Sequence, residues 1–400
     1  MNAEARIKSF VAAEHEAITT MLADLVAIPT VNPPALSYRE CTDYLAGVLA
    51  RWGIEHRVVT VTGGDRPRFS IIGSCGAGES GLHLHGHYDV VSAQSPDQFR
   101  AERRDGRLYG RGTADMKGGI VAMLFALRAI QQCGIGLSKA VTLTLVPDEE
   151  TGGRLGMRHL AAKRLLPSPR FGALMPEPSS RRVIWNACRG ALTLRVHVKG
   201  KATHGAIPQA GLNAFEGMVG VMNDMLALKQ RVLARRTAMP MTPADASRSV
   251  MLLGGASGSG VDSNVVPESA WFSIERRFNP EETLAQVRGE LDQILDRHRA
   301  RGLEIDVETF QESEACVSPA EARLGRVLAE AIEDVTGTRA RSELCPGVLE
   351  TRFFCKGGIP GYGYGPGLLE VSHGPDEYVD LDALFDCTAA YALTAARLLG

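Results

Sequence analysis

Residues Gly119–Val146 read GIVAMLFALRAIQQCGIGLSKAVTLTLV, and this stretch decides the fold class. Its first half, Gly119–Gln132, is strongly apolar and of helical length, which predicts a buried helix. Its end, Ala140–Val146, is a short apolar run that predicts a strand. A helix that leads directly into such a strand favours a sheet covered by helices.

The same alternation of helices and strands continues on both sides of this stretch. Helices are expected at Ala5–Ile28, Arg39–Trp52, Pro319–Thr336 and Leu381–Leu399, and strands at His56–Thr60, Arg68–Ile72, Gly81–His87 and Gly172–Met175. We therefore predict an α/β fold with a central, mostly parallel sheet flanked by helices.

The pattern changes after Cys188. Residues Ala191–Gly200, ALTLRVHVKG, alternate as a half-buried strand of an antiparallel sheet does. The elements expected next are a helix at Asn213–Arg235, a strand at Ser249–Leu253, a glycine-rich turn (GGASGSG), a strand at Ala270–Arg277, a helix at Pro280–Arg301 and a strand at Glu304–Thr309. This β-α-β-β-α-β order predicts an inserted α+β domain at 187–311 within a discontinuous domain formed by 1–186 and 312–400.

The bulk composition narrows the possible partners and location. The 400 residues are 44% hydrophobic and 22% charged with a net charge of −2, so neither nucleic acid nor an anionic membrane is an expected partner. We expect no membrane span, because no apolar run reaches the necessary length, and no signal peptide at the charged N-terminus. The eight scattered cysteines form no C-x-x-C pair, so we expect reduced thiols and a cytoplasmic location.

The segment Gly81–Val91, GLHLHGHYDVV, places His83, His85 and His87 on one face of a strand. Only His87 lies at the strand end, where open α/β sheets build their sites. A strand rises about 3.3 Å per residue, so the other two lie too far down the strand to share a metal ion with ligand bonds of about 2 Å. We therefore expect His83 and His85 to be packed, hydrogen-bonded histidines.

Four further segments carry candidate metal ligands. They are YGRGTADMKGG with Asp115, VPDEETGG with Glu149 and Glu150, MPEPSS with Glu177, and VSHGPDEYVDL with His373. Each also has an ordinary structural explanation. Asp115 could be a helix cap, and Glu149 and Glu150 an acidic helix N-terminus. Glu177 could lie in a surface turn, and His373 could be a structural histidine. Taken together with His87, they form a plausible two-metal set whose mixed ligands suit zinc, cobalt or manganese.

These motifs, in this order and with these separations, resemble the co-catalytic metallopeptidase family that includes acetylornithine deacetylase, succinyl-diaminopimelate desuccinylase, aminoacylases and glutamate-releasing carboxypeptidases. The resemblance covers essentially the whole chain. It implies a hydrolase with two Zn²⁺ ions, replaceable by Co²⁺ or Mn²⁺, in the discontinuous domain. It also implies that the inserted domain is a lid that forms a homodimer.

The resemblance assigns roles residue by residue. His87 and Glu177 are similar to ligands of the first zinc, Glu150 and His373 to ligands of the second, and Asp115 to the bridging carboxylate. Glu149 resembles the general base, and Asp89 the carboxylate that orients His87. The peptide that follows Asp115 is expected to be cis.

The inserted domain and the C-terminal part carry further similarities. His204 in KATHGAIPQAGLNA resembles a histidine that reaches the partner subunit's active site and stabilises the oxyanion. Asn264 in DSNVVP, Arg277 in ERRFNP and Arg352 in LETRFF resemble residues that bind the substrate. The plainer alternatives are a solvated strand end for Arg277 and a helix-surface charge for Arg352.

Three departures from the family pattern bear on the substrate. Pro176 replaces a common glycine, Glu350 replaces a common aspartate, and the loop after DVV lacks the usual proline and tryptophan. We expect an amidohydrolase that cleaves N-acyl amino acids. The alternatives are a dipeptidase or carboxypeptidase with the same chemistry, which would act on short peptides, and a metal-binding regulator without catalysis.

Overall fold

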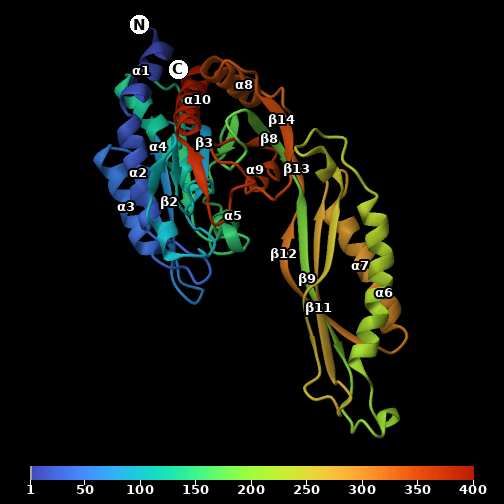
Figure 1. Cartoon of the computed structure of the whole chain (residues 1–400). Helices are drawn as coiled ribbons and strands as arrows, with labels where there is room; N and C mark the ends of the chain where they lie inside the picture. The colour runs from blue at the N-terminus through green and yellow to red at the C-terminus, as the bar shows by residue number, and fades with distance from the viewer. Residues whose placement is uncertain (1) are drawn as a thin grey trace. The chain divides into compact units, whose positions relative to one another are not determined.

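The chain divides into two compact units in the computed structural model, which describes residues 2–400 (Figure 1). The first unit holds the residues up to Asn186 together with Ser318–Glu343 and Glu350–Gly400. The second holds Ala187–Val317 and Leu344–Leu349. The inserted domain was expected to end at residue 311. The second unit extends further, because its last long strand continues to Ser313.

The first unit is built on a sheet whose strands lie in the order β1-β2-β6-β3-β7-β15-β8. The four central strands pair in parallel and the outer ones are antiparallel, which confirms the predicted α/β class. These strands are β1 (Glu55–Val61), β2 (Arg68–Cys75), β3 (Ser80–His87), β6 (Ala140–Val146), β7 (Gly172–Met175), β8 (Val183–Cys188) and β15 (Gly361–Gly363). Two more strands pair with β8: β13 (Cys316–Val317) and β14 (Arg341–Cys345).

The helices of the first unit surround this sheet. They are α1 (Ala3–Ala13), α2 (His15–Ala27), α3 (Tyr38–Arg51), α4 (Lys117–Gln132), α5 (Met157–Ala162), α8 (Arg323–Thr336), α9 (Arg352–Cys355) and α10 (Leu381–Leu399). A small separate sheet has the order β16-β5-β4, formed by β4 (Glu102–Arg104), β5 (Arg107–Tyr109) and β16 (Tyr378–Asp380). No helix among residues 2–400 is long and apolar enough to cross a membrane.

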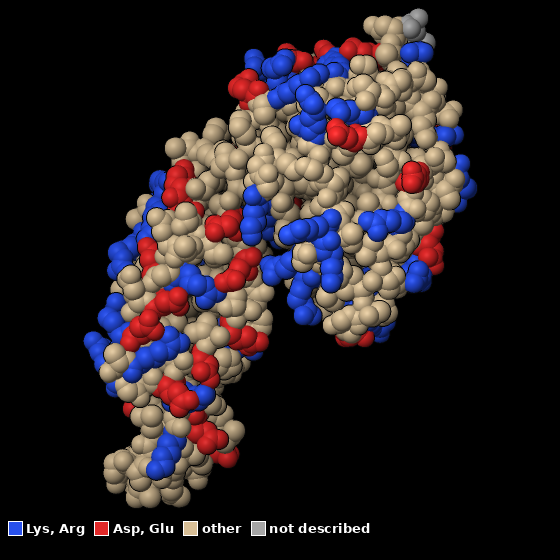
Figure 2. Space-filling view, turned by 180° about the vertical axis from the view of Figure 1, so that it is seen from behind, with Lys and Arg blue, Asp and Glu red and all other residues tan. Residues whose placement is uncertain are grey.

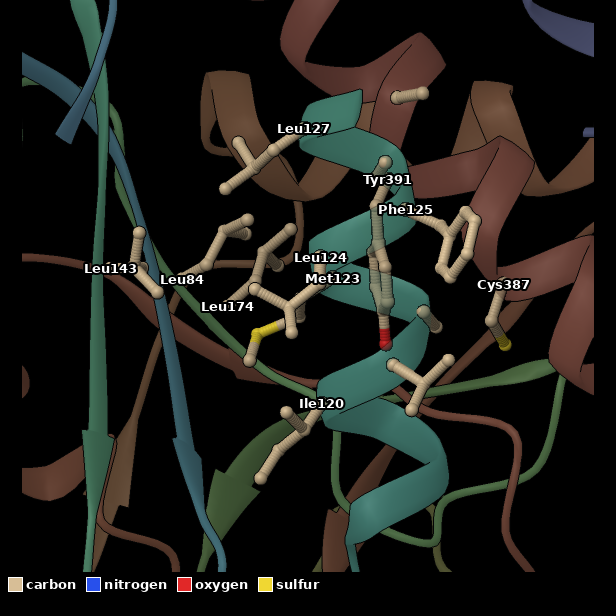
Figure 3. Packing of buried hydrophobic residues seen from close by; sticks show 14 of the residues in the cluster. Leu84, Ile120, Met123, Leu124, Phe125, Leu127, Leu143, Leu174, Cys387 and Tyr391 are labelled. Carbon is tan, nitrogen blue, oxygen red and sulfur yellow. The ribbon is translucent and has the colours of Figure 1, made fainter. Parts of the chain in front are cut away.

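Helix α4 is apolar on all sides because it is covered on all sides (Figure 3). On one side it faces Leu84, Leu143 and Leu174 of the sheet, and on the other it faces Cys387 and Tyr391 of α10. This position explains why its sequence shows no polar stripe, and it makes α4 the centre of the larger hydrophobic core.

The faces of β3 and β6 divide the core from the site. Leu82 and Leu84 belong to the large core, as do Val141, Leu143 and Leu145 of the neighbouring strand. Because side chains alternate along a strand, the three histidines of β3 and the threonines of β6 lie on the opposite face. The polar residues of the site thus share strands with the core without entering it.

The second unit is a four-stranded antiparallel sheet in the order β10-β11-β9-β12 with two helices. Its elements are β9 (Gly190–Lys199), α6 (Ala214–Leu233), β10 (Val250–Ser259), β11 (Ser269–Phe278), α7 (Leu284–Arg299) and β12 (Glu304–Ser313). Their chain order is the predicted β-α-β-β-α-β. The alternate residues of β9 are buried in a core of their own: Leu192, Leu194, Val196 and Val198.

The expected N-terminal helix and the expected glycine-rich turn differ from the structure. The single helix expected at Ala5–Ile28 is two helices, because Glu14 leaves the helical conformation with φ −99° and ψ 7°. No proline or glycine marks this break; His15 instead stacks on Phe385 of α10, with ring centroids 3.6 Å apart. The glycine-rich stretch expected to be a turn continues β10, since Gly254 takes a positive φ of 68° and a bulge absorbs the irregularity.

Helix α7 begins later than expected because Thr283 caps it. The Thr283 hydroxyl accepts from the Gln286 N–H, and the Gln286 side chain accepts from the Thr283 N–H, a complete capping box. We expect Thr283→Ala to lower the free energy of unfolding by about 1 kcal/mol, measured by urea denaturation of the full chain. Gln293→Ala, an exposed change within the same helix, is the control and should cost less than about 0.5 kcal/mol. Equal losses in both variants would contradict the capping role.

Candidate active site

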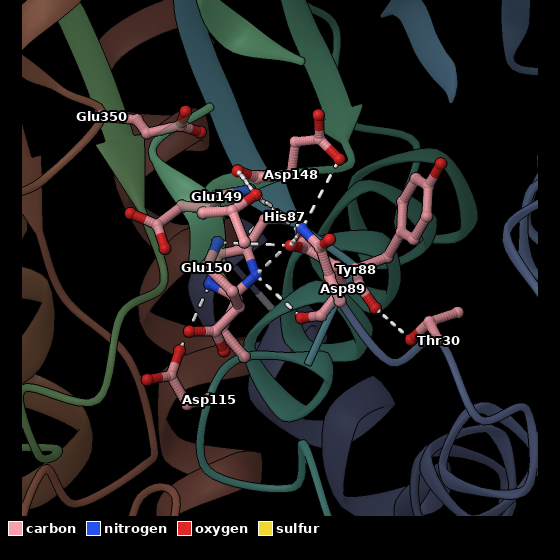
Figure 4. A network of polar contacts seen from close by, with 12 residues as sticks. Thr30, His87, Tyr88, Asp89, Asp115, Asp148, Glu149, Glu150 and Glu350 are labelled. Carbon is pink, nitrogen blue, oxygen red and sulfur yellow. Dashed lines mark hydrogen bonds and ion pairs between the residues drawn. The ribbon is translucent and has the colours of Figure 1, made fainter. Parts of the chain in front are cut away.

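His87 stands at the carboxyl end of β3, at the centre of the parallel strands (Figure 4). It is buried, and its Nδ1 lies 3.0 Å from the main-chain oxygen of Asp89 and 3.5 Å from the Asp89 carboxylate. Its Nε2 therefore faces the other way, 3.2 Å from Asp115 Oδ1 and 3.8 Å from Glu177 Oε1. This orientation leaves Nε2 available as a metal ligand.

Two groups of potential ligands share one carboxylate. The first is His87, Asp115 and Glu177, and the second is Asp115, Glu150 and His373; in each group the ligand atoms lie within 4.8 Å of one another. His373 Nε2 lies 3.5 Å from Asp115 Oδ2 and 3.3 Å from Glu150 Oε2. Asp115 thus turns one oxygen to each group. All five residues predicted as ligands are brought together; their role in binding metal stays a prediction.

The donor set fits divalent metal ions. Glu150 Oε1 is buried and has no hydrogen-bond partner among residues 2–400, which is costly for a carboxylate oxygen unless a cation is bound. Imidazole combined with carboxylates, three residues to a group, suits zinc, cobalt or manganese and leaves coordination positions open. The peptide between Asp115 and Met116 is cis, as expected.

The acids of the site strongly perturb one another. Burial raises the pKa of Glu177 well above its ordinary value and also raises the pKa of Glu150. Asp115 is the exception: burial opposes its ionisation, but hydrogen bonds from His373 and His87 hold its pKa below the ordinary value. The same contacts with Asp115 and Glu150 raise the pKa of His373 to about 10. Bound cations would relieve this crowding of negative charge.

Glu149 belongs to neither group of ligands, although it precedes Glu150 directly. It follows Asp148, whose left-handed backbone (φ 70°) turns the chain after β6. Burial raises the pKa of Glu149 to about 8, and the neighbouring acids add to the shift. Glu149 is half-buried beside the candidate ligands and belongs to neither group, which is where a general base would be placed.

The buried carboxylate of Asp89 organises this turn. It accepts the N–H groups of Glu149 and Glu150, each at 3.2 Å, and also the Asn32 amide at 3.0 Å. Asn32 donates as well to Thr151 Oγ1 at 2.9 Å. Asn32 was not among the predicted site residues, because it lies in a proline-rich loop 57 residues from Asp89 and carries no local signal.

His83 and His85 are packed beneath the site, as predicted. Both are fully buried, and the Thr144 hydroxyl lies 2.9 Å from His83 Nε2 and 2.7 Å from His85 Nδ1. His85 Nε2 lies 2.8 Å from the carboxylate of Glu350, one of the residues expected to depart from the family pattern. Neither histidine belongs to a candidate metal group.

Arg352 is buried, which excludes the alternative of a helix-surface charge. Its guanidinium lies over the Phe353 ring at 4.6 Å, and its NH1 has no hydrogen-bond partner in the described part of the chain. A buried guanidinium with an unused donor is chemically suited to a carboxylate ligand. Its role in substrate binding stays a prediction.

The three remaining candidates lie in the second unit: His204, predicted to stabilise the oxyanion, and Asn264 and Arg277, predicted to bind the substrate. His204 is exposed and forms an isolated bridge with Val265, and the N–H of Gly205 donates to the Asn264 oxygen at 2.7 Å. These contacts place His204 and Asn264 on neighbouring loop segments. Arg277 lies in β11 and pairs with Glu275 at 2.5 Å. Their functions also stay predictions.

The fold and this site define a metal-dependent hydrolase that acts on linear amide bonds. The chain belongs to peptidase family M20/M25/M40, whose model matches residues 83–397. It is 29% identical to a succinyl-diaminopimelate desuccinylase of Xylella fastidiosa, over 94% of this chain and 97% of that protein. It is 28% identical to an acetylornithine deacetylase of Proteus mirabilis, over 89% and 90% of the two chains.

Solved structures share the fold over nearly the whole chain. A family M20 metallo-carboxypeptidase from Sulfolobus solfataricus is similar with a TM-score of 0.77 and 16% identity, over 95% of this chain and 99% of that one. Human carnosine dipeptidase 1 gives 0.75 and 15%, over 99% of both chains. A dinuclear metal-binding peptidase of the family from Bacillus subtilis gives 0.69 and 16%, over 97% and 99%.

Proposed function

We propose that the protein is a two-zinc amidohydrolase that cleaves N-acyl amino acids into an amino acid and a carboxylic acid. The observation that carries the proposal is the pair of ligand groups joined by Asp115, with Glu149 beside them and outside both. The dinuclear metal centre named for the Bacillus subtilis relative supports two ions rather than one. Zinc is preferred for the mixed imidazole and carboxylate ligands, with Co²⁺ or Mn²⁺ as substitutes.

The residues divide the reaction between them. Two bound ions would acidify a water molecule and polarise the amide carbonyl. Glu149 accepts the proton of the attacking water and passes it to the leaving amine, while Asp89 keeps His87 and the Glu149 turn in place. His204 donates a hydrogen bond to the carbonyl oxygen as negative charge develops there. Arg352, helped by Asn264 and Arg277, holds the carboxylate of the amino-acid part.

The substrate class follows from the relatives that match the chain at 28–29% identity, a desuccinylase and a deacetylase. Dipeptidases and a carboxypeptidase share the fold at lower identity, so an exopeptidase that acts on short peptides is the second candidate. A regulator without catalysis ranks last, because Glu149 and all five candidate ligands are present.

A substrate panel tests this choice. Purified protein supplied with Zn²⁺ or Co²⁺ is expected to hydrolyse N-acetyl or N-succinyl amino acids with a higher kcat/KM than dipeptides, measured by amine release. A matched N-acyl compound without the carboxylate should be a poor substrate, because Arg352 then binds nothing. Faster dipeptide cleavage would select the exopeptidase, and failure with every amide and both metals would favour the regulator.

The second unit supports a homodimer. Helix α6 exposes the apolar residues Phe215, Val219 and Leu226 along one side, and the edge strand β10 exposes Val250 and Leu252. Exposed apolar surface next to an unpaired strand edge is typical of a face that another chain covers. On the face seen in Figure 2, acidic and basic side chains of this unit are interspersed. In such a dimer, we propose that His204 acts in the active site of the partner subunit. The expected location of the protein is the cytoplasm.

A further inference from the structure

A buried ion pair lies next to the candidate metal ligands without belonging to them. Arg111 and Glu377 are both almost fully buried, and Arg111 NH1 donates to Glu377 Oε2. A buried pair of this kind costs desolvation energy and contributes little net stability, so its presence calls for another explanation. The contacts of its two members supply one.

Glu377 holds the loop that carries Asp115. Its Oε1 accepts three main-chain N–H groups, those of Gly112 at 2.9 Å and of Ala114 and Asp115 at 3.1 Å. Its own main-chain oxygen accepts from Gly110 at 2.9 Å, continuing the ladder in which β16 pairs with β5. A carboxylate seated in such a set of N–H groups fixes the backbone around it. The direction of the Asp115 carboxylate therefore depends on Glu377.

Arg111 holds the loop that carries His373. Its NH2 donates to the main-chain oxygens of His373 at 3.1 Å and Ser92 at 3.3 Å, and to Gln94 Oε1 at 3.1 Å. The Gln94 amide in turn donates to the same His373 oxygen at 3.3 Å. His373 has a left-handed backbone with φ 65°, a conformation that non-glycine residues adopt only when their surroundings hold them.

The two histidine ligands differ in how much support they need. The His87 side chain is 1% exposed on a buried strand, whereas the His373 side chain is 49% exposed on a loop. The sheet fixes the first, and the second depends on contacts from outside its own segment. Arg111 provides such contacts, and its pairing with Glu377 joins them to the loop of the shared ligand.

We propose that Arg111 and Glu377 are positioning residues that hold Asp115 and His373 in register, so that binding of the second metal ion depends on their pairing. The inference rests on the proposed two-metal function. Arg111 acts mainly on His373, whereas Glu377 acts on Asp115, which both metal groups share. Loss of each residue therefore has a different expected result.

Cobalt binding to the full-length protein tests the proposal. Metal-free protein is titrated with Co²⁺, and the number of ions bound and their affinities are read from visible absorption and calorimetry. Arg111→Met is expected to weaken binding of the second ion, the one held by the group that contains His373, by about 10–100-fold. The affinity for the first ion is expected to stay unchanged. Glu377→Gln is expected to weaken both ions, because the charge that holds the loop is lost. Gln94→Ala, on the surface, should weaken only the second ion, and by less.

Glu282→Gln is the matched control. Glu282 pairs with the buried Arg276 in the second unit, so the variant breaks a similar buried Arg–Glu pair away from the candidate ligands. We expect its melting temperature to fall while both cobalt affinities stay as in the wild type. If Arg111→Met and Glu377→Gln also lost only thermal stability, the positioning role would be overturned. A wild type that bound fewer than two ions would instead refute the two-metal function itself.

Discussion

Glu149→Gln is expected to lower turnover by a factor of about 10² to 10⁴ and to leave two metal ions bound. The amide occupies nearly the same volume as the carboxylate but cannot accept a proton from water. Because Glu149 lies outside both ligand groups, its replacement removes no metal ligand. The measurement is kcat on the best substrate of the panel, together with the metal content of the same samples.

Two controls show whether the loss is chemical. Glu150→Gln changes the adjacent residue, which belongs to the second ligand group, and is expected to lower metal content along with activity. Glu40→Gln changes an exposed glutamate of α3 and should leave both unchanged. Turnover of Glu149→Gln within a few-fold of the wild type would remove Glu149 from the role of general base.

Asp115→Asn is expected to reduce the affinity for both ions by more than about 100-fold, since even residues that merely support a ligand commonly contribute 10–100-fold. Asp115 belongs to both groups, and its Oδ1 and Oδ2 turn to different histidines. An amide offers one good ligand oxygen and no negative charge. Activity should be lost as a consequence of metal loss.

Single-group variants provide the comparison for Asp115. Glu177→Gln changes only the first group and Glu150→Gln only the second, so each should weaken one ion. The affinities are measured by competition with a chelator of known strength. If Asp115→Asn weakened one ion and spared the other, the carboxylate would not bridge, and the proposed arrangement of the centre would be wrong.

Local sequence patterns were sufficient to predict the fold class, whereas the set of candidate ligands rested on the family resemblance as well. The strands Ala140–Val146 and Gly172–Met175 and the helix Leu381–Leu399 have the predicted bounds, because apolar periodicity and strand length decide them locally. The choice of His87 over His83 and His85 followed from strand geometry alone. The five candidate ligands lie at strand ends or in the loops that follow, where an open sheet gathers its functional groups.

The features that the sequence did not reveal depend on distant partners. Arg111 and Glu377 are 266 residues apart, and neither segment indicates that its charge will be buried against the other. The break between α1 and α2 accompanies packing on α10, with no proline or glycine to signal it. The burial of Arg352 likewise depends on tertiary packing, which overrides what a short helical segment suggests.

The contact between His85 and Glu350 has a consequence for protein engineering. The family resemblance leads us to expect aspartate where this chain has Glu350, and consensus residues usually stabilise a protein. Here the longer side chain is what reaches the imidazole, at 2.8 Å in a fully buried pair. An aspartate is one methylene shorter and would leave the buried Nε2 of His85 without its hydrogen-bond partner. Positions 85 and 350 thus form one coupled unit of sequence, to be exchanged between relatives together or left alone.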